Sequence, residues 1–140
     1  MSIIIISWNS NSITAHSTEL KLHIQNTPNK PHVICIQETW LKSKSKFKIP
    51  GYQIESKNRN NGTRGGVATF IMQGLVYERI QNIPNDLEGV TIKIFTSKQP
   101  IIITNIYIPS GTKAIDYDIL KPINDRFEMH EIQTAIRQCK

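Results

Sequence analysis

The chain has 140 residues, the length of one ordinary domain, and its 39% of hydrophobic residues excludes an intrinsically disordered protein. Seventeen Lys and Arg residues against eleven Asp and Glu residues give a net charge of +6, which favours a polyanionic partner such as nucleic acid. Two cysteines, Cys35 and Cys139, are too few for a disulfide framework, and no apolar stretch reaches membrane-spanning length, so we expect an intracellular protein without a membrane partner.

The first predicted unit is a strand, a helix and a second strand. Residues 2–8 form a β-branched run, residues 13–26 have a moderate helical pattern that Pro28 ends, and residues 33–36 are uniformly apolar, which is typical of a strand buried on both faces. A crossover of this length predicts that the two strands are parallel and that their connection is right-handed.

Polar residues follow both of these strands. If the strands are parallel, Asn9 and Glu38 reach the same edge of the sheet, which is where open α/β sheets place their sites. Glu38 offers a hard oxygen ligand of the kind that holds magnesium together with waters and a phosphate. The alternative for Glu38 is a solvated surface charge.

The later elements are mostly strands joined by short turns. From Val67 onward the short turns predict an antiparallel meander. The strands are expected at 52–56, 67–72, 75–80, 90–95 (half-buried, by its alternation) and 101–108. After Pro109 the pattern changes, and helical spacing of apolar residues predicts a short amphipathic helix over 127–140.

Five segments of the chain carry a resemblance to a known family. They are Ser7-Trp8-Asn9-Ser10-Asn11, Pro31 to Leu41, Phe47 to Tyr52, Gly65 to Phe70 and Asn105 to Pro109. In this order they resemble the motifs of the endonuclease/exonuclease/phosphatase superfamily, and together they are similar to the endonuclease domain of jockey-type non-LTR retrotransposons. The resemblance implies an α/β fold, the front half of a two-sheet, four-layer sandwich, and DNA cleavage that depends on Mg²⁺ (or Mn²⁺).

The resemblance also implies roles for individual residues. Glu38 would be the metal-ligating carboxylate, Asn9 would hydrogen-bond the active-site network and the phosphate, and Tyr107 would present its hydroxyl to the phosphate or leaving group. Asn11 is a weaker candidate for nucleic-acid contact. The alternatives are a turn or cap residue for Asn9 and an aromatic filling the edge of a sheet for Tyr107.

Basic residues in two predicted loops are candidates for contact with a phosphate backbone. Lys42 and Lys44 follow the second strand, and Arg59 and Arg64 lie in a polar loop before residue 67. Solvated loops explain these charges equally well.

The sequence departs from the family in several places. Ser12 stands where the family usually has Gly, and Ser110 where a second Pro or an Asn is common. The later motifs, Gly-Asp-Phe-Asn and Ser-Asp-His, which supply the Asp/His pair that activates water, have no counterpart in the sequence. We therefore expect a truncated endonuclease domain that is feeble or inactive, or alternatively a fragment that only binds nucleic acid.

This view divides the chain into three parts. Residues 1–110 would be the N-terminal half of the endonuclease domain, residues 111–126 a linker, and residues 127–140 a short helix that resembles the start of a reverse-transcriptase domain. An uncovered sheet face would allow self-association. A functional retroelement protein of this kind would act in the nucleus.

Overall fold

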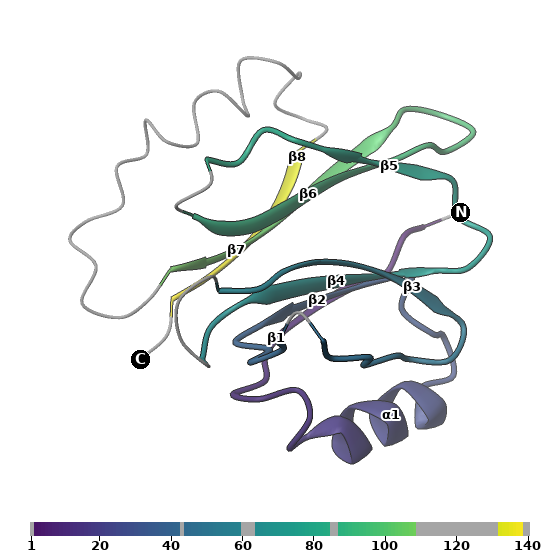
Figure 1. Ribbon diagram of the computed structural model, residues 1–140. Helices are drawn as coiled ribbons and strands as arrows, with labels where there is room; N and C mark the ends of the chain where they lie inside the picture. Colours follow the sequence, from purple (N-terminus) through teal and green to yellow (C-terminus); the bar gives the residue numbers. More distant parts are fainter. Residues whose placement is uncertain (1, 43, 60–63, 85–86, 109–131, 139–140) are drawn as a thin grey trace.

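The computed structural model describes residues 2–42, 44–59, 64–84 and 87–108 and, for the backbone alone, residues 132–138. Two four-stranded sheets pack face to face, and the described helix covers the outer side of the first sheet (Figure 1). In chain order the elements are β1 (Ile5–Asn9), α1 (Ser17–Asn26), β2 (Val33–Gln37), β3 (Tyr52–Lys57), β4 (Val67–Met72), β5 (Tyr77–Ile80), β6 (Glu88–Ile94), β7 (Ile101–Ile108) and β8 (Ile132–Gln138).

The first sheet has the strand order β1-β2-β4-β3. β1 and β2 are parallel, as predicted, while β4 is antiparallel to both β2 and β3. The helix begins at Ser17 rather than at Ile13, because Ile13 is tied to the loop after β2: its N–H donates to the carbonyl of Thr39 at 3.1 Å. Ile13 is nevertheless fully buried beneath the sheet.

Both faces of the first sheet are covered within the chain. On one face, Cys35 and Ile71 pack with residues of the second sheet such as Ile92 and Ile103. On the other face, Ile34 and Phe70 pack with residues of α1 and of the loops. The expectation of an uncovered face is therefore wrong for this sheet, because β5 to β7 supply the opposing layer; self-association itself stays a prediction.

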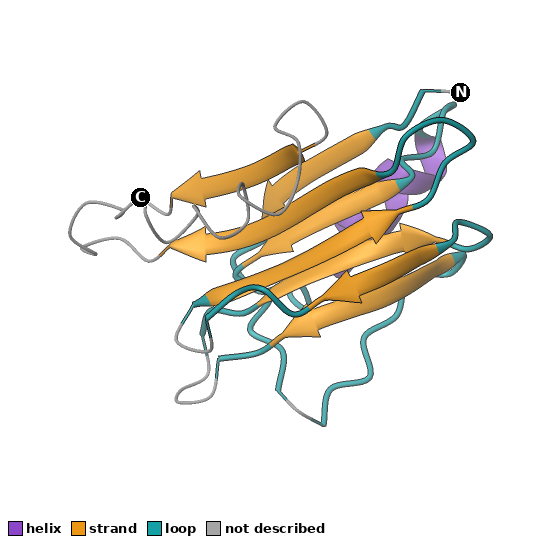
Figure 2. Cartoon of the chain, turned by 90° about the horizontal axis from the view of Figure 1, so that it is seen from above, coloured by secondary structure: helices purple, strands orange, loops and turns teal. Residues whose placement is uncertain are grey.

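The second sheet has the strand order β5-β6-β7-β8. β5, β6 and β7 form the predicted antiparallel meander, but β4 belongs to the first sheet and is not part of it. β6 was expected to be half-buried, yet Thr91 is fully buried and shares a 3.0 Å hydrogen bond with Thr104 of β7. Figure 2 shows the strands of the two sheets lying along broadly the same axis.

The prediction of a helix over 127–140 is wrong for residues 132–138. These residues form β8, which pairs in parallel with β7 from Ile102↔Ile132 to Ile108↔Gln138. A single short helix is marginal in water, whereas a strand beside β7 gains a full ladder of backbone hydrogen bonds. The proposed linker, 111–126, lies outside the described residues, and the boundary at 110 and the reverse-transcriptase likeness stay predictions.

The described part of the chain contains no helix with the length and apolar character needed to cross a membrane.

Candidate active site at the rim of the sheets

Asn9 and Glu38 lie at the same rim of the first sheet, as the parallel pairing predicted. Asn9 is the last residue of β1 and is in register with Gln37, the last residue of β2. The chain continues side by side beyond both strands, since the N–H of Ser10 donates to Gln37 O and that of Ser12 to Glu38 O, each at 2.9 Å. The loops after β1 and β2 are therefore fixed to each other.

The backbone at this rim adopts an unusual conformation. Among the described residues, four other than glycine have positive φ angles: Asn11 (46°), Ser12 (84°), Glu38 (51°) and Trp40 (55°). Such angles are strained for side chains other than Gly and Asn, and strained residues cluster at functional sites. The N–H of Trp40 donates to Gly65 O at 2.9 Å, so the strand-end loop is also tied to the start of β4.

Tyr107 reaches this rim from the other sheet. Its hydroxyl donates to Glu38 Oε1 at 3.0 Å across a sequence separation of 69 residues. Tyr107 is 5% exposed and packs in the core between the sheets, which fixes the direction of its ring. Two of the three predicted catalytic side chains are thus in direct contact, and the third, Asn9, lies on the adjacent strand.

Arg59 lies beside this pair. Its guanidinium donates two hydrogen bonds to the Glu88 carboxylate, both at 2.9 Å, and Glu88 Oε1 also accepts the N–H of Gly66 at 2.9 Å. The guanidinium carbon is 5.9 Å from the centre of the Tyr107 ring. The hydrogen bonds to Glu88 raise the pKa of Arg59 further above its ordinary value. Glu88 offsets the charge of Arg59, which weakens the predicted role of Arg59 in DNA binding.

The other predicted nucleic-acid contacts flank the rim. Lys42 and Lys44 are exposed in the segment after β2. Arg64 is exposed as well and lies over the ring of Trp40, with its guanidinium carbon 5.1 Å from the ring centre. Asn11 is exposed, and its N–H donates to Asn9 Oδ1 at 3.3 Å.

Two groups of residues at the site were not predicted. Glu88 had no local signal, because a single carboxylate at the start of a strand is ordinary. The second group is a buried polar contact in which Gln37 Nε2 donates to Asn105 Oδ1 at 2.8 Å and to Ser7 Oγ at 3.1 Å. Here a signal did exist: Asn105 is a carboxamide within the apolar run 101–108, and a buried polar side chain requires partners.

The donor set at the rim suits a hard divalent ion. Among the described residues, no three His, Cys, Asp or Glu side chains lie close enough together to hold a metal ion. Glu38 supplies a single hard oxygen donor group, which fits magnesium because that ion keeps several waters and is completed by a substrate phosphate. A closed zinc site, which needs four protein ligands, does not fit these residues.

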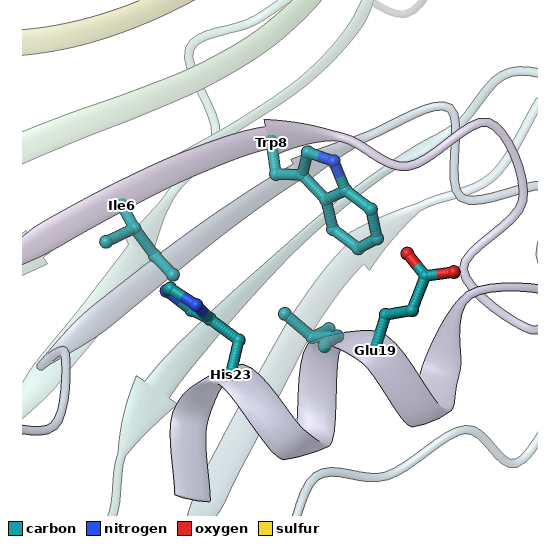
Figure 3. A pocket seen from close by; sticks show the side chains of 5 residues that line it. Ile6, Trp8, Glu19 and His23 are labelled. Carbon is teal, nitrogen blue, oxygen red and sulfur yellow. The ribbon is translucent and has the colours of Figure 1, made fainter. Parts of the chain in front are cut away.

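A hollow in the described structure lies away from this rim. A groove of about 410 Å³ runs between β1 and α1 and is lined by Ile6, Trp8, Glu19, Leu20 and His23. Figure 3 shows Trp8 and Ile6 on the strand facing His23 and Glu19 on the helix. Its floor is apolar, and none of the predicted site residues lines it.

Comparison with known proteins gives matches among solved structures. No protein-family model matches the sequence, and no curated protein sequence matches it. The endonuclease domain of TRAS1, a telomere-specific non-LTR retrotransposon, matches with a TM-score of 0.69 and 13% identity over 96% of this chain and 58% of that one.

Two AP endonucleases match as well. LMAP from Leishmania major has a TM-score of 0.58 and 17% identity over 74% of this chain and 39% of that one. The AP endonuclease from Archaeoglobus fulgidus has a TM-score of 0.56 and 20% identity over 89% of this chain and 50% of that one. The chain thus spans roughly half the length of the structures it matches. The two packed sheets and these matches show that the chain has the endonuclease/exonuclease/phosphatase-type fold.

Proposed function

We propose that this chain carries part of the active site of a magnesium-dependent DNA endonuclease, of the kind found in non-LTR retrotransposons, and that it cleaves DNA feebly or not at all by itself. The observation that carries the proposal is the 3.0 Å contact between the Tyr107 hydroxyl and the Glu38 carboxylate, which come from different sheets. The fold it shares with a retrotransposon endonuclease domain and with AP endonucleases supports DNA as the substrate. The telomere-specific element among these matches is what favours an action in the nucleus.

Each residue of the rim has a chemical role in this proposal. Glu38 would hold the magnesium ion, which stabilises the negative charge of a phosphodiester under attack. The Tyr107 hydroxyl would donate a hydrogen bond to a phosphate oxygen or to the leaving oxygen. The Asn9 amide, on the neighbouring strand, would orient the phosphate. Because Asn9 and Glu38 lie at the ends of paired strands and Tyr107 is packed in the core, these groups are oriented before DNA binds.

The sequence also supports weak activity. It has no counterpart of the Gly-Asp-Phe-Asn and Ser-Asp-His segments, which in the family supply the groups that activate water. A positioned general base contributes about 100- to 10,000-fold to rate. Without that contribution, magnesium and Tyr107 would leave only a slow reaction.

A plasmid-nicking experiment tests the proposal. The wild-type chain is incubated with supercoiled DNA and Mg²⁺ or Mn²⁺ over long times, beside Glu38→Ala and Tyr107→Phe. Glu38→Ala should lower nicking to the level seen with a chelator, and Tyr107→Phe should lower it about 100-fold, since it removes a directed donor. Glu78→Ala, an exposed carboxylate on β5, is the matched control and should nick like the wild type. Equal nicking by the wild type and Glu38→Ala would eliminate cleavage by this chain alone and leave binding without cleavage.

A second candidate function is binding of nucleic acid without cleavage. The net charge of +6 and the exposed side chains of Lys42 and Lys44 favour it. Its test is the salt dependence of DNA affinity, in which Lys42→Ala or Lys44→Ala should each lower the slope by about one unit if the lysine neutralises a phosphate. Salt-dependent binding together with equal nicking by the wild type and Glu38→Ala would select this candidate.

A further inference from the structure

Asn105 joins the two sheets through its side chain. It lies within β7, is fully buried, and its Nδ2 shares two hydrogens among three acceptors: Ile36 O at 3.2 Å, Ala68 O at 3.0 Å and Thr69 Oγ1 at 3.2 Å. Its Oδ1 accepts from Gln37 Nε2 at 2.8 Å. A single amide of the second sheet thus contacts both β2 and β4 of the first sheet.

These contacts lie directly next to the Tyr107–Glu38 pair. Gln37 and Glu38 are consecutive, while Asn105 and Tyr107 are two residues apart on β7 and therefore share a face of that strand. The two cross-sheet hydrogen bonds, 2.8 Å for Gln37–Asn105 and 3.0 Å for Glu38–Tyr107, therefore run side by side. A shift of β7 that displaces Asn105 also displaces Tyr107.

The apolar core orients the Tyr107 ring but contributes no directional bond between the two sheets. Val90, Ile92 and Ile103 pack beside Tyr107 through apolar contacts, which have no preferred direction. The Asn105 amide is directional, and a buried amide that loses its partners pays a large desolvation penalty. A slip of β7 by one residue would turn Asn105 to the opposite face and break all four contacts.

We infer that Asn105 is a positioning residue, which locks β7 against the end of β2 so that the Tyr107 hydroxyl meets the Glu38 carboxylate. The chemical use of that pair rests on the proposed function, whereas the locking of its geometry does not. Asn105 acts through Tyr107 and Gln37 and does not contact the substrate.

The NMR signal of the Tyr107 ring tests this inference in the full chain. With ¹³C-labelled tyrosine, the Cζ signal of Tyr107 is assigned by its loss in Tyr107→Phe, and Glu38→Gln gives the reference displacement for a neutral acceptor. Asn105→Leu should move the Tyr107 signal by at least half of that displacement. The matched control is Thr104→Val, which removes a buried hydrogen bond to Thr91 on the opposite face of β7 and should leave the signal in place.

A double variant separates positioning from stability. Replacing both partners, as in Gln37→Leu with Asn105→Leu, leaves fewer unpaired polar groups and should recover part of the stability lost in Asn105→Leu. The Tyr107 signal should stay displaced all the same. If Asn105→Leu does not fold, Gln37→Leu, which removes the 2.8 Å contact alone, takes its place and should also displace the signal.

The outcomes distinguish this inference from the proposed function. A wild-type Tyr107 signal in folded Asn105→Leu overturns the inference, whatever the activity. If added Mg²⁺ does not move the Tyr107 signal of the wild-type protein, that result counts against the metal site. The effect of Asn105 on the signal can still be measured in that case. Where nicking is detectable, Asn105→Leu should lower the rate at saturating DNA at least tenfold without changing the DNA concentration that gives half the rate.

Discussion

Ser12 is held in a conformation that suits glycine. Its φ of 84° is in the left-handed region, where a Cβ costs about 1–2 kcal/mol, and its Oγ accepts one exposed hydrogen bond from Ala15 N at 3.3 Å. Ser12→Gly should therefore raise the free energy of unfolding by about 0.5–1 kcal/mol, since relief of strain exceeds the loss of an exposed hydrogen bond. Denaturant unfolding measures this change.

Asn11→Gly is the control for Ser12→Gly. Asn11 has a φ of 46°, but asparagine tolerates this region, so its replacement should gain less. A destabilised Ser12→Gly protein would show that the serine side chain contributes more than its strain removes.

Single residues were predictable where a strand end determines their position. Asn9 and Glu38 were placed together because parallel strands deliver their ends to one rim, and the structure confirms that placement. The contact of Glu38 with Tyr107 could not be obtained from spacing, because it depends on how two sheets pack. The Arg59–Glu88 ion pair was missed for the same reason: its residues are 29 positions apart, with no local pattern to join them.

At the scale of elements, the loop before β4 packs tightly on the second sheet. Gly65 has a φ of +79°, and a Cβ added there would overlap Glu88 Oε1 and the Arg59 guanidinium. Gly74, in the turn after β4, has a similar φ of +95°, but no described heavy atom lies within 4 Å of its added Cβ. A side chain would therefore be strained by the backbone at both positions, but only at Gly65 would it also overlap neighbouring side chains.

This difference gives a prediction for paired alanine variants. Gly74→Ala should cost about 1–2 kcal/mol of stability through strain alone. Gly65→Ala should cost about 1–3 kcal/mol more, because the methyl group displaces the Arg59–Glu88 pair. Urea unfolding of the two variants measures both losses, and equal losses would mean that the loop rearranges freely around the added methyl group.

Elements were predictable where local pattern and tertiary pairing agree. The bounds expected for β4 and β7 match the structure, since each is a continuous β-branched or apolar run between turn residues. For residues 132–138 the local pattern favoured a helix, but pairing with β7 decided the outcome. The assignment of β4 to the first sheet also escaped prediction, because short turns join strands of different sheets as readily as strands of one.

For the whole molecule, the packing of the two sheets buries the Cys35 thiol between them. Burial raises the pKa of Cys35 from 9.0 to about 12. Above pH 9 the unfolded chain loses this proton while the folded chain keeps it, so the thiol's contribution to stability is complete below pH 9 and is lost as the pH rises toward 12. The loss should approach about 1.4 kcal/mol per pH unit within this range.

Cys35→Ala isolates that contribution. The variant creates a cavity and is less stable at every pH, so the quantity to compare is the slope of unfolding free energy between pH 9 and 11. Burial also raises the pKa of Tyr52 and Tyr77, but both tyrosines are present in each protein and cancel in the comparison. Parallel slopes for wild type and Cys35→Ala would show that the thiol titrates as if it were exposed.

The parts of the overall architecture that depend on local sequence features were predictable. The parallel first pair and the meander of β5 to β7 rest on crossover and turn lengths, which are local, and both are confirmed. The face-to-face closure of the sheets within this chain was not foreseen, because it depends on long-range packing of residues such as Ile71 and Ile92.

β1 is an edge strand of its sheet, so the exchange of its amide protons can report whether another strand pairs with it. The backbone hydrogen bonds of Ile4 O and Ser10 N show that the N–H and C=O groups of the even-numbered residues of β1 point toward β2. The N–H groups of Ser7 and Asn9 therefore point outward, away from every described strand. In deuterated water the amides of Ile6 and Trp8 should exchange slowly and those of Ser7 and Asn9 quickly. Any polypeptide that adds a strand to this edge would erase the odd–even alternation, so exchange rates at four residues report on such a partner without a functional assay.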